Sequence, residues 1–139
     1  MPITPEQLAA NGSEDGHQLA LMCWCALNQD QYPELKWLFA IPNGGSRHIA
    51  EATKLRAMGV KDGVPDLCLP VKRGSWSALY IELKKPAKDK KKSGKTSNEQ
   101  NEWITFLQSQ GFGAIVCYGW ENARDTLIAY LNYDKQFIR

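Results

Sequence analysis

The chain has 139 residues, of which 43% are hydrophobic and 23% are charged, and this size and composition predict one folded domain rather than a disordered chain. No apolar stretch reaches the roughly 18 residues that a membrane-spanning helix needs, and the N-terminus lacks the basic and apolar segments of a secretory signal, so an integral membrane protein is not expected. The net charge of +2 is too small to hold a polyanionic partner by itself.

The four cysteines are expected to be reduced and mostly buried thiols. None of them forms a C-x-x-C pair, and neither histidine lies near a cysteine pair, so the spacing does not favour a zinc site. Unpaired thiols are typical of reducing compartments, which favours a cytoplasmic location. The six residues are Cys23, Cys25, Cys68, Cys117, His17 and His48.

The N-terminal part of the chain predicts an arm followed by a helix. Residues 1–12 are expected to form a loose arm, and residues 13–139 a single domain. Ser13 is a suitable N-cap for a helix over residues 14–29, which carries acidic residues in its first turn.

The middle of the chain predicts a strand, a helix and a β-hairpin. The expected ranges are 36–41 for the strand, 46–59 for the helix capped by Ser46, and 64–71 and 78–84 for the hairpin strands. The short turn between the last two strands favours antiparallel pairing.

The C-terminal part predicts a helix, a buried strand and a final helix. Ser97 and Gln100 match the S-x-x-Q capping box of a helix that runs to Gln110. The apolar residues 113–118 predict a strand, and residues 121–131 a helix. The resulting order of elements predicts an α/β fold, in which a central mixed sheet is flanked by helices.

Two acidic residues fall on the predicted hairpin. Side chains alternate between the faces of a strand, so Glu82 and Lys84 share the face opposite to the apolar residues of strand 78–84. Asp66, on the paired strand, can lie beside Glu82. Two neighbouring carboxylates repel each other, and Mg²⁺ or Mn²⁺ removes this cost with oxygen ligands, here including the backbone carbonyl of Leu83.

Lys84 would lie beside this ion and its bound water. A lysine at this position can orient or deprotonate the water and can neutralise charge on a phosphate oxygen, which are the requirements of phosphodiester hydrolysis. An E-x-K sequence alone is common on exposed strands, where it forms an ordinary ion pair. The Pro65-Asp66 dipeptide on the adjacent strand favours the catalytic reading.

A lysine-rich segment follows directly after Lys84. The loop over residues 85–96 holds six lysines and one aspartate, which leaves the rest of the chain at −3. Such a run is often only a solvated, disordered surface, but its position beside the acids favours a clamp on the DNA backbone. The DNA-binding candidates are Lys85, Lys88, Lys90, Lys91, Lys92 and Lys95, with Arg47, Lys54 and Arg73 as weaker ones.

These motifs together resemble a known nuclease family. Gly63–Leu67 (GVPDL) and Glu82–Lys84 (ELK) resemble the PD-(D/E)xK superfamily, and more narrowly the VRR-NUC family, the virus-type replication-repair nucleases. Asn43–Gly45 followed by Arg47 is similar to the segment before the family's G-x-P-D motif. Ser97–Trp103, which contains Gln100, is similar to its glutamine-containing helix.

The resemblance covers residues 13–131 and implies a restriction-endonuclease-like core. It implies that Asp66 and Glu82 are metal ligands and that Lys84 is the catalytic lysine, with Gln100 supporting the site. It also implies a metal-binding acid on the first helix. Glu14 is the better match for this acid, and Asp15 is the alternative.

The family further implies a substrate and a partner. Stand-alone VRR-NUC proteins are understood as homodimers that cut branched DNA such as four-way junctions, which suggests a role in phage replication or repair. Trp76, Trp120 and Phe137 are candidates for a dimer interface, and a core or ordinary surface role is equally compatible with each of them. Two alternatives stay open: a restriction-like nuclease that reads a DNA sequence, and a DNA-binding module that has lost catalysis.

Overall fold

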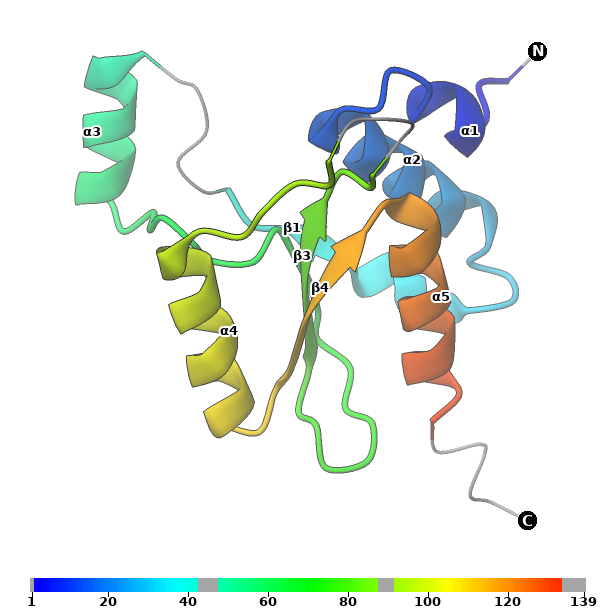
Figure 1. Ribbon diagram of the computed structural model, residues 1–139. Coiled ribbons are helices and arrows are strands. Elements are labelled where there is room, and N and C mark those ends of the chain that lie inside the picture. The colour runs from blue at the N-terminus through cyan, green and yellow to red at the C-terminus, as the bar shows by residue number, and fades with distance from the viewer. Residues whose placement is uncertain (1, 43–47, 88–91, 134–139) are drawn as a thin grey trace.

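A computed structural model describes residues 2–42, 48–87 and 92–133 of the chain. In these ranges a four-stranded sheet lies between helices on its two faces (Figure 1). The elements are α1 (Pro5–Leu8), α2 (Glu14–Leu27), the 3-10 helix η1 (Pro33–Trp37), β1 (Phe39–Ala40), α3 (Ile49–Ala57), β2 (Leu67–Leu69), β3 (Leu79–Lys84), α4 (Asn98–Ser109), β4 (Gly113–Tyr118) and α5 (Trp120–Leu131).

The sheet is mixed, as the sequence predicts. Its strand order is β1-β2-β3-β4. The β1–β2 and β2–β3 pairs are antiparallel, whereas β3 and β4 are parallel and α4 lies on the connection between them. Parallel neighbours require such a crossover, and here it carries the basic loop directly after β3.

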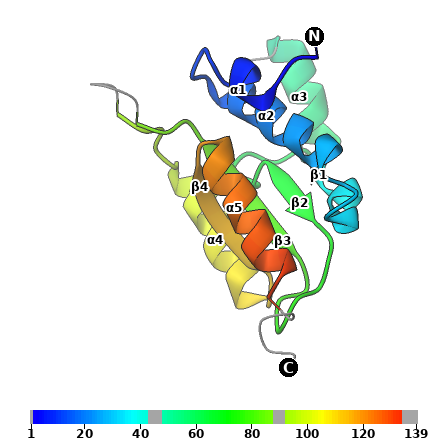
Figure 2. The same cartoon turned by 90° about the vertical axis from the view of Figure 1, so that its right-hand side faces the viewer.

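The hydrophobic core lies on one face of the sheet. Leu79, Ile81 and Leu83 of β3 belong to one buried cluster with residues of α2 and α5, which confirms the predicted inward face of this strand. Figures 1 and 2 place α4 on the side of the sheet opposite to α5. The side chains of Tyr80, Glu82 and Lys84 therefore belong to the face that α4 partly covers.

The structure corrects three expectations about local structure. Residues 5–8, expected in a loose arm, form α1, which has a capping box between Thr4 and Gln7. The strand expected over 36–41 is reduced to Phe39–Ala40, because Pro33 starts a 3-10 helix that ends at Trp37. The strand expected over 64–71 is reduced to Leu67–Leu69, with Pro65 and Pro70 on either side of it.

The helix α3 begins at Ile49, and its expected cap, Ser46, lies outside the described residues. None of the residues of α3 is buried, and the helix stands away from the sheet in Figure 1. The capping box of α4 between Ser97 and Gln100 is present as predicted. All four cysteines are free thiols, three of them buried. Within the described ranges, no helix combines the length and the apolar character of a membrane span.

Candidate active site

The antiparallel pairing of β2 and β3 brings Asp66 to Glu82. Leu67 pairs with Ile81, so one further step along this register places Asp66 opposite Glu82 on the same face. The backbone holds Asp66 from two sides. The N–H of Leu83 donates to Asp66 Oδ2 at 2.8 Å, and the N–H of Ile41 donates to the Asp66 carbonyl at 2.7 Å.

Pro65, the residue before Asp66, affects the hydrogen bonding of the Leu83 backbone. The same register places Pro65 opposite Leu83, whose N–H points toward this side of β3 and is taken by the Asp66 side chain. Proline has no N–H with which to bond the facing carbonyl. The Pro-Asp dipeptide therefore removes the usual ladder donor for the Leu83 carbonyl, the backbone oxygen expected to bind a cation.

Glu82 is a buried acid. Its side chain belongs to a residue only 1% exposed, and Oε1 has no hydrogen-bond partner within the described part of the chain. Burial, a hydrogen bond with Asp66 and the Asp66 charge together raise the pKa of Glu82 to about 9, although the charge of Lys84 opposes the shift. At neutral pH, Glu82 of the metal-free protein therefore keeps its proton.

Lys84 and Glu14 complete the cluster. Lys84 is 7% exposed, and its Nζ lies 3.9 Å from Glu14 Oε2. The charge of Glu14 also contributes to the raised pKa of Glu82. Asp15 is exposed on the next position of α2, and the ion pair with Lys84 is made by Glu14.

The end of the basic loop passes over this ion pair. The N–H of Gly94 donates to the Lys85 carbonyl at 3.0 Å. A Cβ added to Gly94 would lie 2.9 Å from Glu14 Oε2 and 3.3 Å from Lys84 Cδ. A larger residue here would have to displace the Glu14 carboxylate, because the loop backbone runs close against both charged side chains.

The acidic cluster suits a hard divalent cation by its chemistry. Its donors are carboxylate oxygens and a backbone carbonyl, which Mg²⁺ and Mn²⁺ prefer. The partnerless Glu82 oxygen is a buried acceptor that an ion can satisfy. In the described ranges no three acidic, histidine or cysteine side chains are already arranged around one point, and the proton on Glu82 must leave before this carboxylate can act as a ligand.

Gln100 has a local structural contact. Its Oε1 accepts the N–H of Ser97 at 2.8 Å, which completes the capping box of α4. The first turn of α4 is nevertheless close to the Pro-Asp segment, because a Cβ on Gly63 would lie 2.7 Å from the Glu99 carbonyl carbon. Gly63, at φ +88°, thus permits α4 to pack against the strand that carries Asp66.

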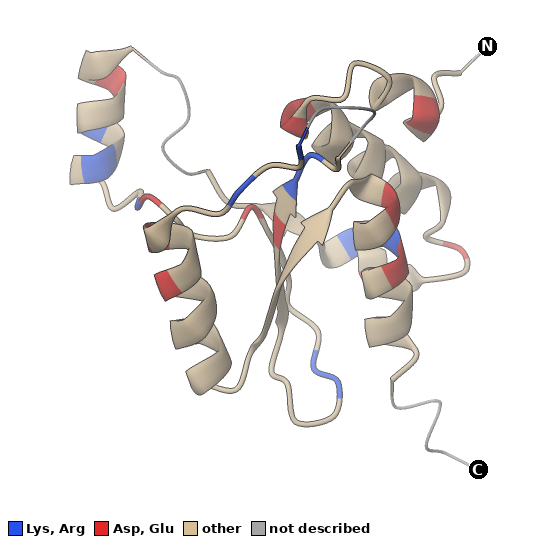
Figure 3. Cartoon of the chain, viewed as in Figure 1, with Lys and Arg blue, Asp and Glu red and all other residues tan. Residues whose placement is uncertain are grey.

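The predicted DNA-binding residues fall into three groups. Lys85, Lys92 and Lys95 are exposed, and Figure 3 shows basic segments gathered at the carboxyl end of β3, beside the acids. Lys54 is exposed on α3. Arg73 makes contacts within the protein: its guanidinium donates to Glu34 Oε2 at 2.5 Å and to the Leu131 carbonyl at 3.2 Å. The remaining candidates, Arg47, Lys88, Lys90 and Lys91, lie outside the described residues.

One buried polar residue near the cluster was missed by the sequence reasoning. His17 is 7% exposed and accepts the backbone N–H of Trp120 through Nδ1 at 3.0 Å. Its spacing from Glu14, one helical turn, was the available signal.

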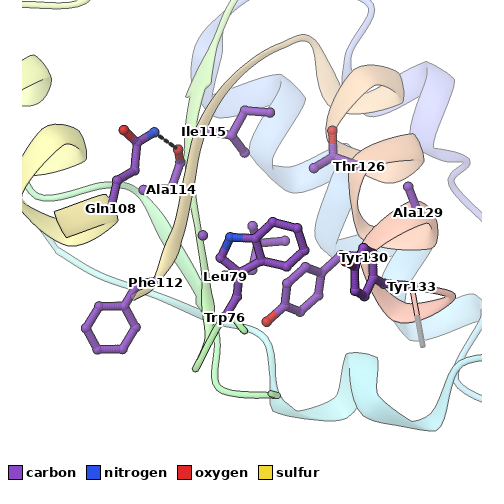
Figure 4. Close-up of a pocket in the computed structure, with 11 residues that line it drawn as sticks. Trp76, Leu79, Gln108, Phe112, Ala114, Ile115, Thr126, Ala129, Tyr130 and Tyr133 are labelled. Atoms are coloured by element: carbon purple, nitrogen blue, oxygen red, sulfur yellow. Dashed lines mark hydrogen bonds between the residues drawn. The ribbon is translucent and has the colours of Figure 1, made fainter. Parts of the chain in front are cut away.

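A separate apolar pocket of about 550 Å³ lies away from the acids (Figure 4). Trp76, Leu79, Phe112 and Tyr130 are among the residues that line it. Leu79 is at the opposite end of β3 from Lys84. The lining includes no acidic or basic side chain, so this pocket is not suited to bind a cation or hydrolyse a phosphodiester.

The chain is similar to a known family model and to a solved structure. The family model of the VRR-NUC domain matches residues 7–121. A solved structure of a "VRR_NUC domain protein" is similar over 87% of this chain and 89% of that chain, with a TM-score of 0.69 and 30% sequence identity. The comparison with curated proteins found no significant match.

Proposed function

This chain belongs to the VRR-NUC family, and from this premise we propose that it is a Mg²⁺- or Mn²⁺-dependent endonuclease that cuts branched DNA. Membership in this family of PD-(D/E)xK nucleases implies nuclease activity, with DNA as the substrate. The observation that carries the proposal is the buried Glu82 beside the half-buried Asp66, with the buried Lys84 on the same strand face. A stable fold seldom buries one acid directly beside a second without a chemical use for them.

The residues of the cluster have distinct roles in this proposal. Asp66, Glu82, Glu14 and the Leu83 carbonyl would hold the cation, which when bound supplies Lewis acidity and a water of lowered pKa. Lys84, fixed in a buried position beside Glu14, places its ammonium group against the phosphate or the attacking water. There it offsets the negative charge that develops on the phosphate oxygens in the transition state.

We further propose a DNA structure as the substrate and a homodimer as the oligomeric state. The stand-alone form of the family favours a homodimer, in which a two-fold axis would place two sites on two strands of a four-way junction. Trp120 is only 3% exposed and belongs to the core, which is one of the roles that the sequence left open for it. Trp76 is partly exposed, and Phe137 lies outside the described residues. A role in phage replication or repair, in the cytoplasm of the host, belongs to the same proposal.

Cleavage of defined DNA substrates tests the proposal. With Mg²⁺ or Mn²⁺, we expect cuts near the branch point of a four-way junction and much slower cleavage of a linear duplex of the same sequence. EDTA should abolish both. Discrete cuts in linear DNA would instead indicate a restriction-like enzyme, and tight binding without cleavage of either substrate would indicate a non-catalytic module.

We expect Lys92→Ser/Lys95→Ser to weaken DNA binding and to reduce its dependence on salt. Each lysine that neutralises a phosphate contributes about 0.9 to the slope of log affinity against log salt concentration, so this double variant should lose up to about two units of slope. Affinity measured by fluorescence anisotropy at several salt concentrations provides the test.

A matched control for this experiment is Lys36→Ser/Lys72→Ser, which removes the same charge from two other exposed positions. If the basic loop holds the DNA backbone, this control keeps the slope of the wild-type protein. Equal slopes for the two double variants would show that the loop has no special part in binding.

A further inference from the structure

His17 connects the helix that carries Glu14 to the chain directly after β4, at the end of the sheet that carries Lys84. It is buried on α2, one turn after Glu14, and its Nδ1 accepts the N–H of Trp120 at 3.0 Å. An accepting Nδ1 carries no proton, so the imidazole is the neutral tautomer with its proton on Nε2. Trp120 is 103 residues away in the sequence, which makes this a long-range tertiary contact.

The contact closes a ring of interactions around the candidate active site. The N–H of Gly119, the residue before Trp120, donates to the Lys84 carbonyl at 2.8 Å. The two adjacent amides thus bond to the backbone of Lys84 and to the side chain of His17. From His17, one turn of α2 leads to Glu14, whose Oε2 lies 3.9 Å from Lys84 Nζ.

The ion pair alone is a weak means of fixing this geometry. The side chain of Glu14 is 45% exposed, and a solvent-accessible ion pair contributes little stability. The hydrogen bond of His17, in contrast, is buried, and leaving the Trp120 N–H without an acceptor would be costly. The buried bond is therefore the better candidate to set the position of the first turn of α2 relative to Lys84.

We propose that His17 is a positioning residue, which holds Glu14 at the cation site by anchoring α2 to the Gly119–Trp120 amides beside Lys84. This inference rests on the proposed function. A simpler role exists for the same bond: the first N–H groups of a helix lack intrahelical acceptors, and His17 satisfies one of them for α5. If His17 is a positioning residue, its loss changes the position of the Glu14 side chain. If His17 only caps α5, its loss leaves Glu14 in place.

Two substitutions separate the acceptor from the bulk of the side chain. His17→Asn keeps an acceptor oxygen at a position similar to Nδ1, whereas His17→Leu keeps most of the volume and removes the acceptor. Loss of a residue that orients a metal ligand typically costs 10- to 100-fold in metal affinity or activity. We expect His17→Leu to weaken Mn²⁺ binding, measured by electron paramagnetic resonance of the free ion, by about tenfold, and His17→Asn to remain within about twofold of wild type.

The chain offers a matched control and a coupling test. His48, the other histidine, is exposed, and His48→Asn should leave Mn²⁺ binding unchanged. In a Glu14→Gln background, His17→Leu should cause no additional loss of Mn²⁺ affinity or cleavage rate, because the residue on which it acts is already altered. An independent, additive loss in this background would overturn the proposal.

A readout in the metal-free protein separates this proposal from the proposed function. The ¹³C resonance of the Glu14 carboxyl carbon should shift in His17→Leu and stay near its wild-type position in His17→Asn. If wild type neither binds Mn²⁺ nor cuts DNA, the proposed function fails, and this resonance still decides whether His17 positions Glu14. An unchanged Glu14 resonance in His17→Leu would overturn the inference, whatever the activity of the protein.

Discussion

Replacing Lys84 by alanine should lower the rate of DNA cleavage by about 10²- to 10³-fold and leave the affinity for DNA nearly unchanged. The expected loss is large because the ammonium group is buried, at 7% exposure, and charges act more strongly where water is excluded. DNA affinity should persist because the exposed lysines of the loop, rather than Lys84, meet the DNA backbone in our proposal. The Glu82→Ala variant should show the same separation between binding and cleavage.

Single-turnover cleavage of a junction with saturating protein measures the chemical step without the contribution of binding. Lys72→Ala, at an exposed lysine remote from the acids, is the control for loss of one positive charge and should cut at the wild-type rate. The assignment of the site would be wrong if Lys84→Ala or Glu82→Ala cut at the parental rate. A parallel loss of binding and cleavage would instead indicate that Lys84 binds DNA and does not act in the chemical step.

The sequence was sufficient to predict the β3 face and the pair of acids. Alternation along residues 79–84 separates the apolar side chains from Glu82 and Lys84, and a short turn leaves antiparallel pairing as the simplest connection. Under that pairing Asp66 comes to lie next to Glu82, as observed. The capping box at Ser97 was also predictable, because its signal is local.

The predictions that were wrong or left open depend on contacts between segments that are distant in the sequence. The strand around Asp66 is short, with prolines on either side of it, although its apolar residues fit a longer strand. The choice between Glu14 and Asp15 was open because both are in the first turn of α2, and only packing against β3 distinguishes them. The buried hydrogen bond of His17 links residues 103 positions apart, and local sequence patterns do not predict contacts between residues so far apart in the chain.

The second large effect concerns the stability of the metal-free protein. Burial raises the pKa of Glu82 to about 9, whereas in the unfolded chain this carboxyl titrates near its ordinary value of 4.5. Below pH 4.5 both states are protonated, and the contribution to stability is fully present. As the pH rises toward 9 the unfolded chain binds fewer protons than the folded one, so the free energy of unfolding falls by at most about 1.4 kcal/mol per pH unit.

Glu82→Gln should remove this decline, because the amide has nearly the same shape and no charge to bury. In EDTA, the urea concentration at the midpoint of unfolding should fall between pH 5 and pH 9 for wild type and much less for Glu82→Gln. The variant should therefore be the more stable protein at pH 9, by on the order of a few kcal/mol. Glu102→Gln, at an exposed acid of α4, is the control and should follow wild type.

The proton on Glu82 also determines how the stabilisation of the wild-type protein by a cation should depend on pH. Binding requires both carboxylates of the Asp66–Glu82 pair to be ionised, so protons and Mn²⁺ compete for the pair. At a fixed Mn²⁺ concentration, the increase in unfolding free energy should be small at pH 5 and should grow toward pH 9. Glu82→Gln, which has lost a ligand, should gain little at either pH. If the wild-type and Glu82→Gln midpoints changed in parallel with pH and with Mn²⁺, the buried carboxyl would not be the group that links proton release to ion binding.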